Sequence, residues 1–336
     1  MSDAETLRRL LRRIDRRGYK AYREIEGAYS VGEFTLFIDK VQSDPFAPPS
    51  KVRLRISRKA ARLPEDLAEG KIRRIALSDF IARKVREGIG RLPGVRRGSG
   101  KSGRIFIDAG GQEVLERTSI ILTEDWVEAR MEVGLPAAGR TILAREAEEL
   151  LLKDFLEAGK YGLLFDASRE REARKFVYCV ENQEFIRSKL QERHLVAFVA
   201  DGSVLPRKSG ASDLPMERDL AIPFRSPPEL RVEFELPNPL SLEDGSLRHI
   251  TGMGLPEGVT LIVGGGFHGK STLLKAIERG VYPHIPGDGR EYVVTRPHAV
   301  KIRAEDGRRV EKVDISPFIG KLPGGVFTKE LSTDDA

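Results

Sequence analysis

Residues 259–277 read VTLIVGGGFHGKSTLLKAI. They begin with a short apolar, β-branched run, continue through a glycine-rich turn, and end in a stretch with apolar residues at helical spacing. Four residues separate Gly264 from Gly269, which Lys270 and Ser271 follow, and this is the spacing of a phosphate-binding P-loop. The order of strand, glycine turn and helix therefore predicts a nucleotide-binding loop at the start of a helix.

Each residue type in this stretch suits a phosphate group. Glycines let backbone N–H groups approach a phosphate closely because they have no Cβ atom, and a helix N-terminus adds partial positive charge. Lys270 is expected to contact the β and γ phosphates, Ser271 to coordinate Mg²⁺, and Thr272 to lie beside the α phosphate. The His268 side chain is expected to point away, and no catalytic residue is identified. The full set of predicted nucleotide-binding residues is Gly264, Gly265, Gly266, Phe267, His268, Gly269, Lys270, Ser271 and Thr272.

Composition limits the class of protein. A chain of 336 residues exceeds what one core usually holds, so two domains are expected. Hydrophobic residues make up 40%, without the long apolar run of a membrane span or a secretory signal. Cys179 is the only cysteine, which excludes an intrachain disulfide and a cysteine-based zinc cluster. We expect a soluble, cytoplasmic protein, although the arginine-rich start leaves a mitochondrial presequence open.

Positive charge is concentrated near the start of the chain. Residues 1–100 contain 24 Lys and Arg against 13 Asp and Glu, whereas the whole chain contains 57 against 51. Such asymmetry predicts that this part meets a polyanion, with an ordinary solvated surface as the alternative. Residues 98–103 imitate a P-loop with the first glycine out of register, and we interpret them as a flexible basic loop, either a linker or a phosphate contact. The candidate nucleic-acid contacts are Lys51, Arg53, Arg55, Arg96, Arg97 and Lys101.

Local patterns also predict the elements around these sites. Apolar residues alternate with Lys51, Arg53 and Arg55, which predicts a strand with the three cations on one face. Trp126 is expected in the core. Helices are expected over 3–17, 145–156 and 169–192, strands over 34–41, 52–56, 118–123, 126–133, 195–200 and 230–236, and a helix break at 159–162.

With these elements in place, the chain resembles a known family. The resemblance rests on residues 259–276, on Asn182 and Gln183 followed by residues 195–207, and on residues 314–323. These stretches are similar to the predicted ATPases of the ABC class, a family without a transporter domain. The resemblance implies an α/β protein, with an α+β N-terminal domain at 1–160 and a partial P-loop NTPase core of ABC type at 161–336. It also implies ATP and Mg²⁺ as cofactors, a link to RNA through the N-terminal domain, and a head-to-tail homodimer.

The sequence departs from this family after the P-loop. An ABC core needs a strand ending in Asp, an adjacent Glu, a signature segment and a switch His downstream of the P-loop. Only 65 residues follow Ser271, and they contain no run of four apolar residues that ends in Asp-Glu. Asp314 follows a single apolar residue, Val313. We therefore expect the chain to be part of a longer protein that continues into these motifs.

Three functions remain open at this stage. The first is an ATPase that couples ATP binding or hydrolysis to RNA or another nucleic acid, with hydrolysis expected of the complete protein. The second is a nucleotide-dependent RNA-binding module without hydrolysis of its own. The third is a P-loop kinase for a small molecule, because such enzymes share the same glycine and lysine spacing.

Overall fold

The structure is a computed structural model of the chain. It describes residues 2–94, 97–242, 247–263, 268–302, 311–317, 320 and 328–332. Residues 1–299 form one compact unit and residues 300–336 a second one. In the second unit, Val313 and Leu331 exchange two backbone hydrogen bonds of 3.0 and 2.9 Å. None of the helices in the described residues is long and apolar enough to cross a bilayer.

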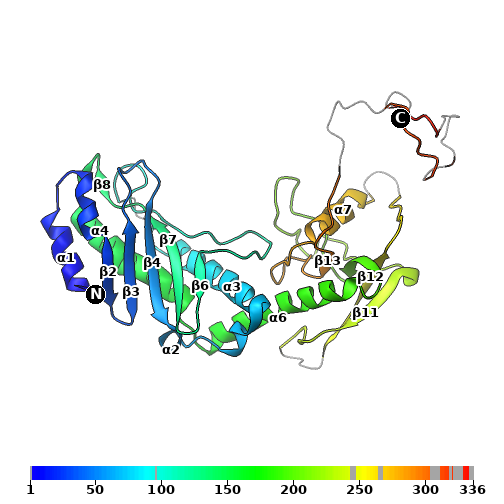
Figure 1. Ribbon diagram of the computed structural model, residues 1–336, viewed down its shortest axis with the longest axis horizontal. Helices are drawn as coiled ribbons and strands as arrows, with labels where there is room; N and C mark the ends of the chain where they lie inside the picture. Colours follow the sequence, from blue (N-terminus) through cyan, green and yellow to red (C-terminus); the bar gives the residue numbers. More distant parts are fainter. Residues whose placement is uncertain are drawn as a thin grey trace. The chain divides into compact units, whose positions relative to one another are not determined.

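A seven-stranded sheet dominates the first part of the chain (Figure 1). Its order is β1-β2-β3-β4-β7-β5, with β6 also paired to β7, and every pair is antiparallel except β1 with β2. A separate two-stranded ribbon joins β8 and β9. The strands are β1 Ser2–Asp3, β2 Gly27–Val31, β3 Phe34–Lys40, β4 Ser50–Ser57, β5 Ile105–Phe106, β6 Ile120–Leu122, β7 Trp126–Val133, β8 Ala137–Ala138 and β9 Thr141–Ile142.

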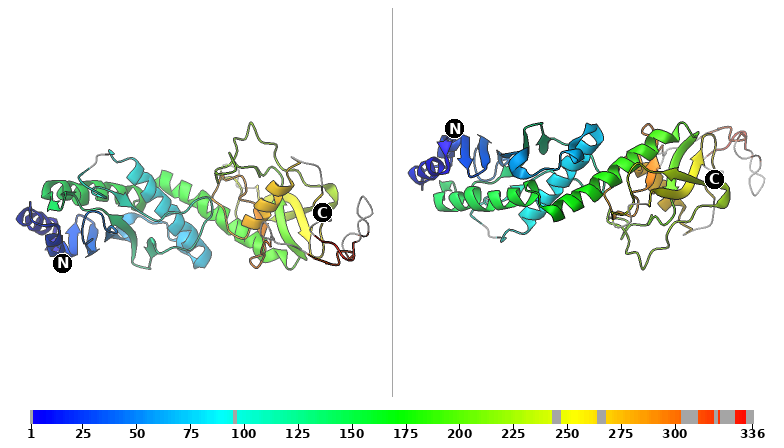
Figure 2. Two further views of the ribbon diagram at one scale, coloured as in Figure 1. Left: turned by 90° about the horizontal axis from the view of Figure 1, so that it is seen from above. Right: turned by 90° about the horizontal axis from the view of Figure 1, so that it is seen from below.

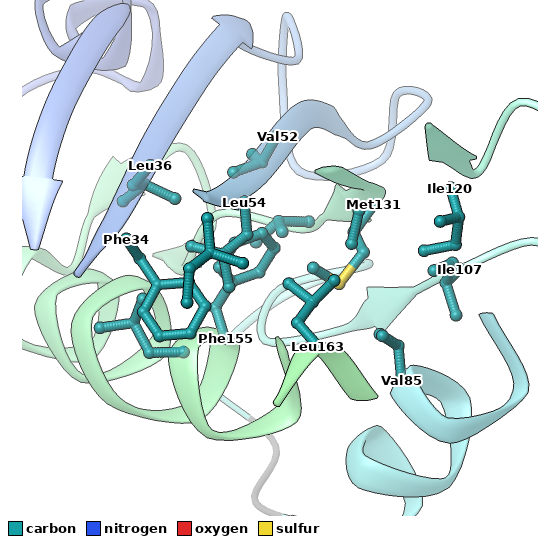
Figure 3. Close-up of a cluster of buried hydrophobic side chains, with 14 of the residues drawn as sticks. Phe34, Leu36, Val52, Leu54, Val85, Ile107, Ile120, Met131, Phe155 and Leu163 are labelled. Carbon is teal, nitrogen blue, oxygen red and sulfur yellow. The ribbon is translucent and has the colours of Figure 1, made fainter. Parts of the chain in front are cut away.

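Helices cover one face of this sheet. Because side chains alternate along a strand, β4 directs Val52 and Leu54 to the buried face and its cations to the other face. Figure 3 shows Leu54 beside Phe155 and Leu163, which come from a helix packed on the sheet. The helical elements of this part are α1 Ala4–Arg13, η1 Tyr19–Ile25, α2 Arg58–Ala61, η2 Asp66–Ala68, α3 Gly70–Gly90, α4 Ala144–Glu149, η3 Leu150–Asp154 (a π-helical turn) and α5 Phe155–Leu163.

The expected helix break at 159–162 is wrong. Helix continues from α4 through η3 to the end of α5. A Cβ atom added to Gly159 would lie 2.1 Å from Leu54 Cδ2, and one added to Gly162 would lie 2.4 Å from Val85 Cγ2. The two glycines therefore allow α5 to pack closely on the sheet and on α3, and they do not end the helix.

The long helix α6, Ala167–Leu190, is drawn in green in Figure 2. It contributes side chains to two hydrophobic cores. Asp166 caps it by accepting a hydrogen bond of 2.8 Å from the Arg169 N–H. Phe176 and Val177 belong to the core under the seven-stranded sheet, whereas Ile186 and Leu190 belong to the next core along the chain. The helix expected over 169–192 is therefore confirmed. The spacing of its apolar residues did not indicate that it packs in two separate cores.

The second core lies on a four-stranded antiparallel sheet of order β11-β12-β10-β13. Strands β12 and β13 were not predicted, since Gly252 and Gly254 lower the strand propensity of β12. A Cβ at Gly252 would lie 2.3 Å from the Val199 carbonyl oxygen, so close approach of two strands requires glycine there. The elements are β10 Leu195–Ala200, η4 Pro228–Leu230, β11 Arg231–Glu235, β12 His249–Pro256, α7 Lys270–Arg279 and β13 Val293–Thr295.

Two further expectations are corrected. Residues 259–263 form no strand, and Val259, Leu261 and Val263 are 74%, 64% and 82% exposed. Trp126 is only half-buried, because it lies on the sheet face away from the helices, where the guanidinium of Arg55 lies 3.8 Å from the centre of its ring. The strands expected over 34–41, 52–56, 126–133, 195–200 and 230–236 are confirmed within two residues at each end.

Candidate nucleotide-binding and nucleic-acid-binding sites

The P-loop helix is α7, and it begins as the motif requires. Gly269 precedes it with φ of +80°, in the left-handed region that favours glycine. A Cβ at Gly269 would meet no atom within 4 Å, so the requirement there is conformational. Lys270 and Ser271 follow as the first two residues of the helix. Gly264, Gly265, Gly266 and Phe267 lie outside the described residues.

The first turn of α7 is accessible to solvent, whereas its last turn is packed and hydrogen-bonded to the rest of the protein. No side chain of the described residues caps the N-terminus, and Ser271 is exposed. At the other end Ala276 is buried, and the Thr295 hydroxyl donates a hydrogen bond of 2.7 Å to the Ile277 carbonyl. The unsatisfied N–H groups of a first turn attract anions. The helix is therefore anchored at its C-terminal end and can receive a phosphate at its N-terminal end.

Buried polar residues fix the segment that follows α7. The Gln183 side chain accepts from the His284 N–H at 2.7 Å and donates to the His284 carbonyl at 2.9 Å. Asp288, which is 1% exposed, lies 2.8 Å from His284 Nδ1 and accepts from Arg207 Nη2 at 2.8 Å. Arg207 is thus engaged in the fold, and residues 283–290 have a defined path behind the P-loop helix.

The other candidate surface is the basic face, which comprises Lys51, Arg53, Arg55 and Arg130 on the side of the large sheet away from α3 and α5. The expected placement of the first three on one face is confirmed, and Arg130 of β7 lies opposite Arg53. Arg53 and Arg55 lie 4.3 and 4.8 Å from the centre of the Phe37 ring. Surfaces that bind single-stranded nucleic acids combine positive charge with aromatic rings and arginines on which bases stack.

Carboxylates neutralise much of the charge of the basic face. Glu128, fully buried, accepts hydrogen bonds from Arg53 at 2.8 Å, Arg55 at 2.7 Å and Arg130 at 3.1 Å. Burial acts to raise the pKa of Glu128, but hydrogen bonds from Arg55 and Arg130 and the charge of Arg53 lower it overall. Glu132 forms a more exposed ion pair with Lys51. Glu128 therefore holds three guanidinium groups in place.

An open cavity of about 450 Å³ lies beside this face. Its lining contains equal numbers of basic and acidic residues. It also includes Ser119, whose buried hydroxyl has no hydrogen-bond partner within the described residues. The exposed ring of Phe106 also borders it. The charged lining residues are Lys51, Arg53, Arg130, Asp39, Asp108 and Glu132.

The loop at 98–103 is not the flexible basic segment that its sequence indicates. Arg97 is 7% exposed, and its guanidinium donates to Glu146 and Glu149 at 2.8 Å and to Asp154 at 2.7 Å. Three carboxylates thus bind the guanidinium that was expected to face a phosphate, so Arg97 is not available as a nucleic-acid contact.

Backbone contacts hold the rest of this loop. The N–H of half-buried Lys101 donates to the Pro45 carbonyl at 2.9 Å, and the Gly103 N–H donates to the Gly134 carbonyl at 2.7 Å. Arg96 lies outside the described residues.

Comparison with known proteins matches both parts of the chain. Residues 4–163 match a family model described as the N-terminal part of ATPases of the ABC class, and residues 169–336 match one described as an ABC ATPase P-loop domain. A stretch of 150 residues is 33% identical to an uncharacterized protein of Methanocaldococcus jannaschii, and it covers 43% of this chain. The chain spans 32% of that relative's length.

Proposed function

The chain belongs to the family of ATPases of the ABC class, and we propose that it binds ATP with Mg²⁺ at the N-terminus of α7. The observation that carries this proposal is Gly269 in the left-handed conformation, directly before a helix that starts with Lys270 and Ser271 and whose N-terminus is capped by no side chain of the described residues. Lys270 contributes a positive charge to the β and γ phosphates, and the Ser271 hydroxyl suits a hard cation such as Mg²⁺. Thr272 lies next to the α phosphate, and Gly264, Gly265, Gly266, Phe267, His268 and Gly269 surround the chain of phosphates.

Titration of the protein with MgATP and with AMP tests this site. Because the site recognises phosphate charge, MgATP is expected to bind at least tenfold more tightly than AMP. Isothermal titration calorimetry measures both affinities. Equal affinities would place recognition on the nucleoside and would contradict a phosphate-binding loop.

Hydrolysis is proposed for the whole protein. Phosphoryl transfer needs charge stabilisation and a positioned water in addition to the phosphate-binding loop. We propose that two copies associate head to tail around ATP and supply these groups together, in the cytoplasm. Membership in the ABC class argues against the alternative of a small-molecule kinase. The division into domains at 1–160 and 161–336 is part of this proposal, and the two family matches support it.

We also propose that the basic face binds RNA or another nucleic acid. The arginines stacked on Phe37 and Trp126 offer both positive charge and planar groups to an unpaired base. Lys51 is 59% exposed and Arg130 is 46% exposed, so both can exchange a protein carboxylate for a phosphate. Lys101 lies on the neighbouring loop and remains a proposed contact.

Substitution Arg55→Ala is expected to weaken the binding of single-stranded RNA by about three- to tenfold, since one charged hydrogen bond and one stacked cation are lost. The slope of log K against log salt is expected to fall by about 0.7, the value for one phosphate on a single strand. Fluorescence anisotropy with a labelled oligonucleotide at several salt concentrations measures both.

The matched control is Arg145→Ala, which removes an arginine that is 90% exposed on α4, away from the basic face. Its affinity and slope are expected to equal those of the parent protein. An equal loss in both variants would indicate general charge attraction and would remove the special role of the basic face.

A further inference from the structure

A loop of the N-terminal part reaches the segment behind the P-loop helix. We call residues 109–117 the bridging loop. The Val114 N–H donates to the Pro283 carbonyl at 2.7 Å, and the Ile285 N–H donates to the Gln112 carbonyl at 2.9 Å. These two hydrogen bonds form a short antiparallel pairing between residues more than 160 positions apart. The contact joins the region of the first family match to that of the second.

An ion pair connects the same loop to α7 itself. The carboxylate of Glu113 lies 3.6 Å from Nε of Arg279, the last residue of α7. The Glu113 side chain is 18% exposed and that of Arg279 is 49% exposed, so water screens the pair only in part. A helix of ten residues is about 15 Å long, so this pair and the proposed phosphate site stand at opposite ends of one rigid element.

Arginines of α3 hold the bridging loop from the N-terminal side. Arg83 donates to the carbonyls of Gly111 at 2.5 Å and of Glu113 at 3.0 Å, and Arg86 donates to the Gly110 carbonyl at 2.9 Å. A Cβ added to Gly110 would lie 2.6 Å from Nη2 of Arg117, so the loop also packs closely on its own Arg117. The loop is therefore connected to α3, which packs in the core under the large sheet.

The other side of the contact is equally fixed. Gln183 of α6 holds the His284 backbone by two hydrogen bonds, and Arg187 of α6 donates to the Gly280 carbonyl at 2.7 Å. The end of α7 is thus connected to α6 and to the bridging loop at once. A displacement of α7 along its axis must change one of these contacts.

We propose that Glu113 is a positioning residue for the P-loop helix, and that the bridging loop couples ATP binding at α7 to nucleic-acid binding by the N-terminal part. This inference rests on the proposed ATP site and on the proposed binding of nucleic acid. Binding of a phosphate at the N-terminus pulls on a helix whose other end is tied to α3 through Glu113. By linkage, each ligand then changes the affinity for the other by the same factor.

Hydrogen exchange of the full chain, with and without MgATP, tests the coupling. The amides of Val114 and Ile285 are expected to exchange several-fold more slowly with MgATP, because the pairing tightens when α7 is held at both ends. The amide of Leu36 in β3 is the control and is expected not to change. Unchanged exchange at Val114 and Ile285 while calorimetry shows MgATP binding would overturn the inference and leave the ATP site standing. Absence of MgATP binding would overturn both.

Charge substitutions distinguish a positioning function of Glu113 from a purely structural one. Glu113→Gln keeps the backbone pairing and is expected to weaken MgATP binding by about three- to fivefold, with the same melting temperature. The double variant E113R/R279E restores the pair in reverse and is expected to recover most of this loss. Glu116→Gln changes an acid of the same loop that is 69% exposed and is expected to leave the affinity unchanged.

Coupling itself is measured as the ratio of MgATP affinities with and without a saturating single-stranded RNA. In the parent protein, saturating RNA is expected to change the MgATP affinity by about fivefold, which is within the usual range for linked sites. In Glu113→Gln it is expected to approach one. An unchanged ratio in Glu113→Gln, or a double variant as weak as the single one, would contradict a positioning function for Glu113.

Discussion

Substitution Lys270→Ala is expected to weaken MgATP binding by about 10- to 150-fold, the range for losing one or two charge-assisted hydrogen bonds. Lys270 is the first residue of α7 and follows the left-handed Gly269, which is the position from which the lysine of a P-loop contacts the β and γ phosphates. The helix N-terminus alone cannot replace the charge of this ammonium, because its N–H dipoles supply only about half a unit charge.

Lys275→Ala is the matched control for this measurement. Lys275 lies on the same helix, about 1.4 turns further, and its side chain is exposed. The two variants lose the same charge from the same element, and only the position differs. Calorimetric titration with MgATP is expected to show an affinity within twofold of the parent for Lys275→Ala. An affinity within twofold for Lys270→Ala would make the P-loop assignment wrong.

Substitution Arg97→Met is expected to destabilise the chain by about 3–5 kcal/mol, the usual cost of removing one partner from a buried ion pair. The Arg97 and Asp154 side chains are 6% and 7% exposed and are joined by a hydrogen bond of 2.7 Å. Without the guanidinium, the carboxylate of Asp154 remains desolvated and unpaired. Urea unfolding, monitored by circular dichroism, measures this loss of stability as a lower midpoint concentration of urea.

A double variant identifies the origin of this effect. Arg97→Met with Asp154→Leu removes both charges and is expected to recover most of the lost stability, because an apolar pair of similar volume avoids the desolvation cost. Arg145→Met, at a side chain that is 90% exposed, is expected to change stability by less than about 0.5 kcal/mol. A stable Arg97→Met variant with weakened RNA binding would return Arg97 to the nucleic-acid contacts.

Features that depend on near neighbours were predictable from the sequence. Alternation along β4 placed Lys51, Arg53 and Arg55 on one face because successive strand residues point in opposite directions. The start of α7 at Lys270 followed from glycine and lysine spacing, since a P-loop is a local conformation of a few residues. The family resemblance was confirmed for the same reason, because it rests on contiguous motifs.

Features that depend on distant partners were decided only by the tertiary structure. Arg97 looked like a surface cation until Asp154, 57 positions away, was found beside it. Gly162 looked like a helix break, but it faces Val85 of another helix. Glu113 carried no signal at all, and it meets Arg279 only because two parts of the chain pack together. Charge and residue type are properties of the sequence, whereas burial and pairing depend on which other elements come into contact, and tertiary packing alone determines that.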